Sequence, residues 1–138
     1  MKKEKVLIYA FAMIMVATVF VGCQKDEPKA DVRESYVGSY RTNYEYFFDG
    51  MQYTGTYTLT IVKSSTNAND IILNNIDGWG ESARASVNGN SMTIPQQTIL
   101  EYGVSGSGTL NGNVLNFSTQ ETQTGGVIVN VTQTATKQ

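Results

Sequence analysis

Tyr53-Thr54-Gly55-Thr56-Tyr57-Thr58-Leu59-Thr60-Ile61 alternates strictly between two kinds of side chain. Successive side chains of an extended chain point to opposite sides, so the threonines would share one face and the remaining residues the other. A period of two over this length predicts a β-strand with one buried face and one face in water. This stretch therefore predicts a fold built from β-strands.

The residues immediately before this strand repeat its pattern. Within the stretch 36–48, Tyr40, Tyr44 and Tyr46 fall on one predicted face, opposite polar and charged residues. The two stretches are joined by Asp49-Gly50, and Asp-Gly is a preferred pair for the type I′ turn of a hairpin. We expect a hairpin whose buried face is rich in aromatic residues.

Short segments with similar alternation continue downstream, separated by Gly- and Asn-rich turns. The further predicted strands cover residues 71–73, 83–87, 92–94, 104–110, 114–120 and 127–136. Pro95 is expected to end its strand, because proline cannot donate to a ladder hydrogen bond. Residues 96–103 receive no assignment, and no helix is expected from Tyr36 onward.

About eight strands joined in sequence order predict an all-β fold, an antiparallel up-and-down meander that forms a barrel or a flattened sandwich. Residues 87–94 and 110–117 support a meander, since both read hydrophobic, Asn-Gly-Asn, x, hydrophobic, x, hydrophobic. Two copies are too few for a solenoid and are interpreted as two hairpins.

The amino-acid composition excludes several classes of active site and partner. The chain has 138 residues, which suits one domain, and its 10 basic and 12 acidic side chains give a net charge of −2 that disfavours a nucleic-acid partner. It has no His, which removes imidazole bases, His-paired nucleophiles and most zinc sites. Its one Cys cannot form an internal disulfide. We expect no cofactor and no metal.

The N-terminal residues have the features of a delivery signal. A short basic start precedes the uncharged stretch 6–21, whose length lies between a secretory signal and a spanning helix. Phe20-Val21-Gly22-Cys23 then resembles the lipobox of a bacterial lipoprotein. This resemblance implies that residues 1–22 are a signal peptide and that Cys23 is lipidated. The alternative is an uncleaved anchor helix, and in both cases the folded part is tethered to a membrane.

Residues 23–35 are expected to form a flexible tether and residues 36–138 the folded domain. Gln24-Lys25-Asp26-Glu27 resembles the surface-export signal that follows the lipidated Cys of Bacteroidetes lipoproteins. The resemblance implies an outer-membrane protein that faces the cell surface. A periplasmic-facing position is the alternative, because any tether is polar.

Val37-Gly38-Ser39-Tyr40, at the start of the first predicted strand, resembles the Gly-x-Trp/Tyr opening of lipocalin-like and calycin-like barrels. Together with the lipobox, the Asn-Gly-Asn hairpins and the Thr-rich final strand, it makes the chain similar to small Bacteroidetes lipoproteins with such domains. Tyr40 stands where these barrels usually carry Trp, and Lys137 stands where an Arg partner would be.

Aromatic residues are concentrated in the first two predicted strands, and Tyr combines an apolar ring with a hydroxyl that needs a partner. Such a wall could stack on sugar rings or line a small-ligand pocket. The candidate ligand-binding residues are Tyr40, Tyr44, Tyr57, Trp79 and Tyr102. The alternative is that large side chains fill the barrel opposite Ala83, Ala85, Gly106 and Gly108.

The acidic residues are scattered along the chain. A carboxylate-dependent hydrolase would need Asp70, Asp77, Glu81 or Glu101 to meet in one cleft. Asp77 precedes a glycine, as turn residues do, and is interpreted as structural. The Gly-rich stretch 103–108 lacks the Lys and the helix of a phosphate loop and is interpreted as allowing close packing.

We therefore expect a non-enzymatic, lipid-anchored barrel of the cell envelope that binds a small hydrophobic or glycan ligand or a surface protein partner. An open mouth lined by aromatic residues would favour the ligand, and a closed core would favour the protein partner. The alternatives are an inhibitor of an envelope or host hydrolase, acting through an exposed loop such as residues 96–103, and a small carboxylate-dependent hydrolase.

Overall fold

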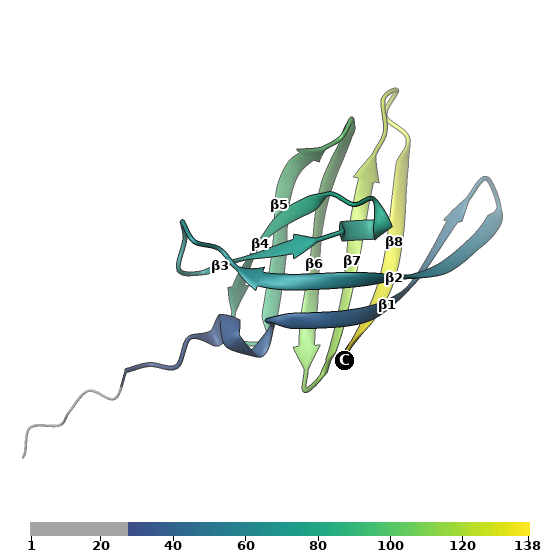
Figure 1. Ribbon diagram of the computed structural model, residues 1–138. Helices are drawn as coiled ribbons and strands as arrows, with labels where there is room; N and C mark the ends of the chain where they lie inside the picture. The colour runs from purple at the N-terminus through teal and green to yellow at the C-terminus, as the bar shows by residue number, and fades with distance from the viewer. Residues whose placement is uncertain (1–27) are drawn as a thin grey trace, which may run out of the picture. The chain divides into compact units, whose positions relative to one another are not determined.

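The computed structural model describes residues 28–138, and the compact unit within them is Asp31–Gln138. Its eight strands are β1 (Gly38–Phe48), β2 (Met51–Lys63), β3 (Asp70–Asn74), β4 (Ser82–Asn88), β5 (Ser91–Ile99), β6 (Tyr102–Asn111), β7 (Val114–Thr122) and β8 (Ile128–Lys137). Neighbouring strands are antiparallel and follow one another in sequence order. β8 pairs with β1, so the meander closes into a barrel (Figure 1). The predicted all-β meander of about eight strands is confirmed, in its barrel form.

The faces of the strands follow the predicted alternation. In β2, Leu59 and Ile61 are buried while Thr58 and Thr60 are exposed. The turn between β1 and β2 has positive φ angles at both Asp49 (49°) and Gly50 (75°), as a type I′ turn requires. The predicted hairpin is therefore present, but its aromatic face is buried only toward the closed end of the strands: Tyr40 is buried, whereas Phe48 and Tyr53 near the tip are exposed.

The prediction that Pro95 ends its strand is wrong. The strand continues to Ile99, and its register with β6 shifts between Ile94 and Gln97. This bulge places the proline outside the regular ladder, where its missing N–H costs no hydrogen bond. Residues 96–103 complete β5, turn at Leu100 and Glu101, and begin β6, so they do not form a long exposed loop.

Two single-turn 3₁₀ helices accompany the strands, η1 (Val32–Ser35) and η2 (Ile76–Gly78). The sequence predicts no helix after Tyr36, and η2 is the exception. Within residues 28–138, no helix has the length and apolar character needed to cross a bilayer. The predicted signal peptide, Cys23 and the stretch 24–27 lie outside the described residues.

η1 and its neighbours cover one end of the barrel, which we call the closed end. The Tyr36 side chain is fully buried, and its hydroxyl donates to the carbonyl oxygen of Gly89 in the β4–β5 turn (3.2 Å). The Arg33 guanidinium donates to the carbonyl oxygens of Ser64 and Asn67 in the β2–β3 loop (3.1 and 3.0 Å). The packed unit thus includes residues 31–35, which the sequence analysis assigned to the tether.

The start of β1 and the end of β8 meet at this closed end. The Lys137 ammonium lies 5.8 Å from the centroid of the Tyr40 ring and donates to the carbonyl oxygen of Ser35 (3.1 Å). The Tyr40 hydroxyl donates to the carbonyl oxygen of Tyr36 (2.7 Å). A cation over an aromatic face thus links the first and last strands.

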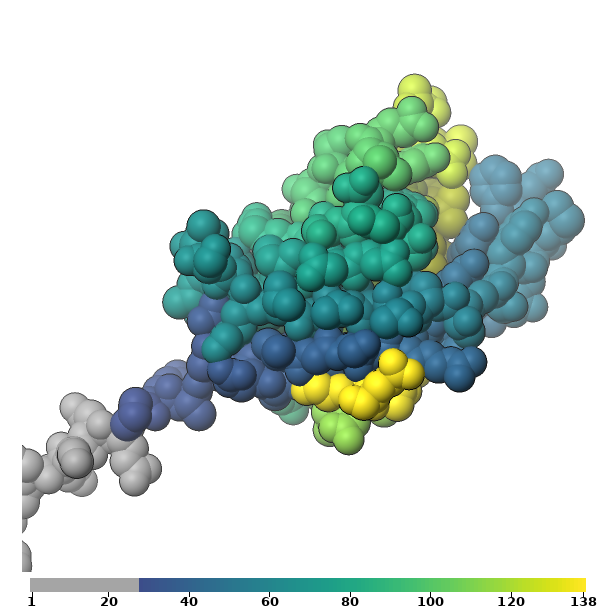
Figure 2. Space-filling view, viewed as in Figure 1, coloured from purple at the N-terminus to yellow at the C-terminus, as the bar shows by residue number. Residues whose placement is uncertain are grey.

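The opposite end, which we call the mouth, consists of the β1–β2 tip, the η2 segment and the β5–β6 and β7–β8 turns. The β1–β2 hairpin projects from the body of the domain (Figure 2). The mouth carries a set of exposed large hydrophobic residues, which we call the apolar rim: Phe47, Phe48, Met51, Tyr53, Leu100, Val127 and Ile128.

Candidate functional site

A small pocket of about 130 Å³ lies at the mouth. It is lined by Tyr44, Tyr46, Asp77, Trp79, Glu121 and Val131. Three neighbouring strands (β7, β8 and β1) supply one wall, and the η2 segment supplies the carboxylate of Asp77 and the ring of Trp79. One water occupies about 30 Å³, and pockets for drug-sized ligands measure about 300–1,000 Å³. This pocket is therefore large enough for the head group of a ligand but too small for a whole drug-sized molecule.

The η2 segment has an unusual backbone that places Asp77 over the barrel interior. Asn75 (φ 65°) and Asp77 (φ 53°) both adopt positive φ, a conformation that non-glycine residues rarely take. The Asn75 side chain holds the segment, donating to the carbonyl oxygen of Thr58 (2.8 Å) and accepting from the amide of Gly80 (2.7 Å). The buried Ile76 side chain anchors the turn in the core. Such strain is concentrated at functional sites more often than elsewhere.

A hydrogen-bonded network lies beneath the pocket. The Tyr57 hydroxyl donates to Oε1 of Gln133, and Nε2 of Gln133 donates to Oδ1 of Asp77 and to the hydroxyl of Thr119 (3.1 Å for the last). The Thr119 hydroxyl in turn donates to Asp77 Oδ1 (3.2 Å). Asp77 Oδ2 is buried and has no hydrogen-bond partner. One oxygen of Asp77 is therefore satisfied by the barrel, and the other is left free.

Glu121 is the second carboxylate of the pocket. It continues the inward row of β7, and the residue as a whole is 8% exposed. Burial, followed by repulsion from Asp77, raises its pKa to about 7. Burial likewise raises the pKa of Asp77 to about 6, against the opposing effect of the hydrogen bonds from Gln133 and Thr119. Near neutral pH the pocket thus holds two carboxyl groups that can gain or release a proton.

Aromatic rings frame the two carboxylates. Tyr44 and Tyr46 stack with their centroids 6.2 Å apart, and Tyr46 stacks on Tyr53 at 5.0 Å. On the η2 side, Trp79 packs against Tyr102 with a centroid distance of 5.2 Å. The rings present flat apolar faces with negative electrostatic character.

The five predicted site residues lie in three different places in the structure. Tyr44 and Trp79 line the pocket, and Tyr102 supports Trp79. Tyr57 lies deeper, in the hydrogen-bonded network, where burial raises the pKa of its hydroxyl. Tyr40 is fully buried at the closed end and does not reach the mouth.

The acidic residues proposed for a hydrolase do not meet. Asp70 begins β3, away from the mouth, and binds Arg84 (2.9 Å) and Ser86 (2.7 Å). Glu81 and Glu101 are exposed on the mouth and do not line the pocket. The actual partner of Asp77 is Glu121, which the sequence analysis did not select. The inward row of β7 was the signal that could have found it, because Glu121 continues the period of Leu115, Phe117 and Thr119.

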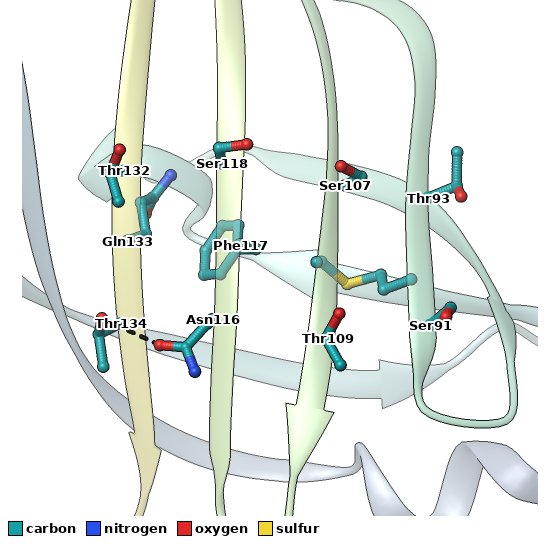
Figure 3. A pocket seen from close by; sticks show the side chains of 12 residues that line it. Ser91, Thr93, Ser107, Thr109, Asn116, Phe117, Ser118, Thr132, Gln133 and Thr134 are labelled. Carbon is teal, nitrogen blue, oxygen red and sulfur yellow. Dashed lines mark hydrogen bonds between the residues drawn. The ribbon is translucent and has the colours of Figure 1, made fainter.

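The outer face of the barrel carries a second, shallower hollow of about 660 Å³ across β5–β8 (Figure 3). Hydroxyl and amide side chains from these strands surround it, and Thr134 donates to Oδ1 of Asn116 (3.2 Å). It has no charged lining residue. An adjoining hollow of about 450 Å³ over β8, β1 and β2 shares Thr132 and Thr134 with it.

Among residues 28–138, no group of three or more carboxylate or Cys side chains is arranged to hold a metal ion. No protein-family model matches the chain, and no curated protein matches it in sequence. Its function is therefore inferred from the geometry of the barrel and its mouth.

Proposed function

We propose that this protein is a non-enzymatic binding barrel that takes the head group of a small ligand into the mouth pocket. The observation that carries the proposal is the pocket itself, in which Asp77 Oδ2 is buried without a partner and aromatic rings stand on two sides. A protein avoids leaving a buried polar atom unpaired, because the lost hydration costs about 1–3 kcal/mol. A ligand that donates to this oxygen would recover that cost.

The lipid anchor and the envelope location belong to the same proposal. They are supported by the lipobox that ends at Cys23 and by the polar stretch 24–27. The calycin-like lineage is supported by the opening Gly38-Ser39-Tyr40 and by the Tyr40–Lys137 pair, which occupies the place of the usual Trp and Arg. We expect the barrel to face the cell surface from the outer membrane.

The single Trp of the chain supplies the test, because Trp79 lies in the pocket wall. The full chain, extracted from membranes in detergent, is titrated with N-acetylglucosamine, decanoate and choline while Trp79 fluorescence is followed. At least one probe should change the emission saturably, and Tyr46→Ala should weaken that binding by about tenfold.

Ser107→Ala, in the outer hollow, is the matched control and should leave the affinity unchanged. A loss caused by Ser107→Ala but not by Tyr46→Ala would move the site to the outer face. No saturable response to any probe would contradict a small-ligand site at the mouth.

A second candidate function uses the same pocket. A carboxylate-dependent glycosidase needs one protonated carboxyl group as the acid and a second, ionised carboxylate as the base or nucleophile. The mouth pocket holds two carboxyl groups, and Glu121 (pKa about 7) would be the acid beside Asp77 (pKa about 6). Release of nitrophenol from nitrophenyl glycosides that is abolished by both Asp77→Asn and Glu121→Gln would establish this activity. Hydrolysis that survives both substitutions would reject it.

A further inference from the structure

Charge is divided unequally between the two ends of the barrel. The mouth segments, residues 45–54, 75–82, 99–103 and 121–128, contain six acidic residues and no Lys or Arg. At the closed end, Arg33, Lys63 and Lys137 bind partners around η1. The mouth therefore carries a negative field that attracts cations and repels anions.

Two observations separate the pocket from a merely acidic surface. Glu121 is more than nine-tenths buried, and no hydrogen bond contributes to the pKa of its carboxyl group. Asp77 Oδ2 is the buried unpartnered atom beside it. Each carboxylate thus offers a free oxygen in a place from which water is partly excluded, where a buried charge is costly unless it is paired.

The aromatic rings add a second recognition element for positive charge. Tyr44, Tyr46 and Trp79 all line the pocket beside the two carboxylates. An organic cation is attracted to the face of such rings within about 6 Å, and sites for quaternary ammonium groups are built from them. A neutral sugar would use the rings but would leave the carboxylates without a counter-charge.

We propose that the mouth pocket binds an organic ammonium group, with the cation held between the aromatic rings and the carboxylates of Asp77 and Glu121. This inference rests on the proposed function and names the ligand class. The pocket volume of about 130 Å³ suits an ammonium head group. The rest of the ligand would lie across the apolar rim, whose exposed side chains surround the mouth.

Binding should strengthen as the pH rises. An ammonium ion binds the ionised form of the two carboxyl groups more tightly than the protonated form. At low pH these groups must lose their protons before the ion can bind, so the affinity increases with pH. The groups that face the two carboxylates are Tyr44 and Tyr46 of β1, Tyr57 of β2, Thr119 of β7, Gln133 of β8, and Trp79, which packs on Tyr102 of β6. No Lys, Arg or further carboxylate is among them, so Asp77 and Glu121 are the charged groups of the pocket.

The test uses pairs of probes that differ in charge but little in shape. Trp79 fluorescence of the full chain in detergent is followed during titration with choline and with its uncharged isostere 3,3-dimethylbutan-1-ol. Nα-acetyl-lysine methylamide and Nα-acetyl-norleucine methylamide form the second pair. Choline represents a free small cation, and the blocked lysine represents a side chain of a partner protein. At least one cation should bind ten or more times more tightly than its neutral partner.

Variants locate the cation. Glu121→Gln and Asp77→Asn should each weaken binding of that cation by about tenfold at pH 8, and each should reduce its pH dependence. Glu101→Gln, an exposed carboxylate of the mouth outside the pocket, is the control and should change affinity less than twofold. Equal loss in all three variants would indicate general attraction to the surface and would overturn the proposal.

The outcomes also separate this inference from the proposed function. If the neutral partners or N-acetylglucosamine bind as well as the cations, and Tyr46→Ala weakens them, the mouth is a ligand site but not an ammonium site. If no probe binds saturably at the mouth, both proposals fail. Far-ultraviolet circular dichroism of each variant confirms that the barrel is folded before it is titrated.

Discussion

Gln133 of β8 donates a hydrogen bond to Asp77 of the η2 segment, and this contact fixes the floor of the mouth pocket. The same amide group also accepts from Tyr57 and donates to Thr119. One side chain thus connects β2, β7, β8 and η2 inside the barrel.

Gln133→Leu should destabilise the protein by about 1–3 kcal/mol, because it leaves the Tyr57 hydroxyl and Asp77 without this partner in a buried place. Urea unfolding followed by circular dichroism measures the change. Gln120→Leu is the control, since Gln120 is exposed on β7 and should shift the free energy of unfolding by less than about 0.5 kcal/mol. Equal effects would mean that the network contributes nothing to stability.

Stability should fall as the pH rises from about 4 to about 7. The folded-state pKa values of Asp77 (about 6) and Glu121 (about 7) lie above the ordinary values of 3.8 and 4.5. The native state therefore binds more protons than the unfolded state in this window, and the free energy of unfolding decreases with pH. Asp31, with a pKa lowered to about 2 by its hydrogen bond from Arg33, acts below this window and in the opposite sense.

Urea midpoints at pH 4.5, 6 and 7.5 give this profile. Asp77→Asn and Glu121→Gln should each flatten it, while Glu101→Gln should leave the slope as it is. A slope that is the same in the Glu121→Gln variant would show that Glu121 does not titrate inside the barrel.

The alternating faces of β2 give a sharp comparison between neighbours. Leu59 is fully buried and Thr58 is exposed. Leu59→Ala should cost about 2–5 kcal/mol of unfolding free energy, and Thr58→Ala less than about 1 kcal/mol. A register shifted by one residue would invert the order, so a more damaging Thr58→Ala would contradict the strand faces.

Gly106 tests the close packing of β6 against β7. A Cβ atom at this position would overlap the carbonyl oxygen of Ser118, which is backbone and cannot rotate away. Gly106→Ala should therefore destabilise the protein by roughly 1–3 kcal/mol or more. Ser107→Ala, at the neighbouring exposed position, is the control and should be close to neutral. Thermal unfolding of the two variants makes the comparison.

Lipidation can be tested on Cys23 directly. Cys23→Ser should abolish labelling by radioactive palmitate and leave the precursor uncleaved, because the thiol is the proposed acceptor of the lipid. Labelling and mass spectrometry of membrane fractions measure both effects. A variant that is still labelled and processed would show that Cys23 is not the anchor.

Much of the fold follows from local alternation. The faces of β1 and β2, their Asp49-Gly50 turn and the meander order are all determined by neighbours in the chain, so the sequence predicts them. The continuation of β5 beyond Pro95 could not be predicted, because the bulge that accommodates the proline depends on the partner strand β6 as well as on the proline itself. The same holds for η2, whose positive φ angles are supported by Asn75 reaching across to Thr58.

The candidate site was only half predictable for a related reason. Tyr44 and Trp79 were selected as aromatic residues, a property that each has by itself. The pairing of Asp77 with Glu121 depends on the closed circle of strands, which brings together residues far apart in the chain. Asp77 precedes a glycine, as turn residues do, and this local pattern predicts only a turn. In the structure Asp77 does lie in the η2 turn, and it also places a buried carboxylate oxygen at the pocket.

The pairing of β1 with β8 has a consequence for how the protein is made. The partner registers join Tyr40 to Lys137 and Tyr46 to Val131, so these contacts span most of the domain. During synthesis or export, β1 emerges first and must wait, with one edge unpaired, until β8 has followed β2–β7. Long-range strand pairing of this kind is slow, and an unpaired edge is open to aggregation. Chains held before β8 is released should therefore depend on chaperones that cover the free edge of β1.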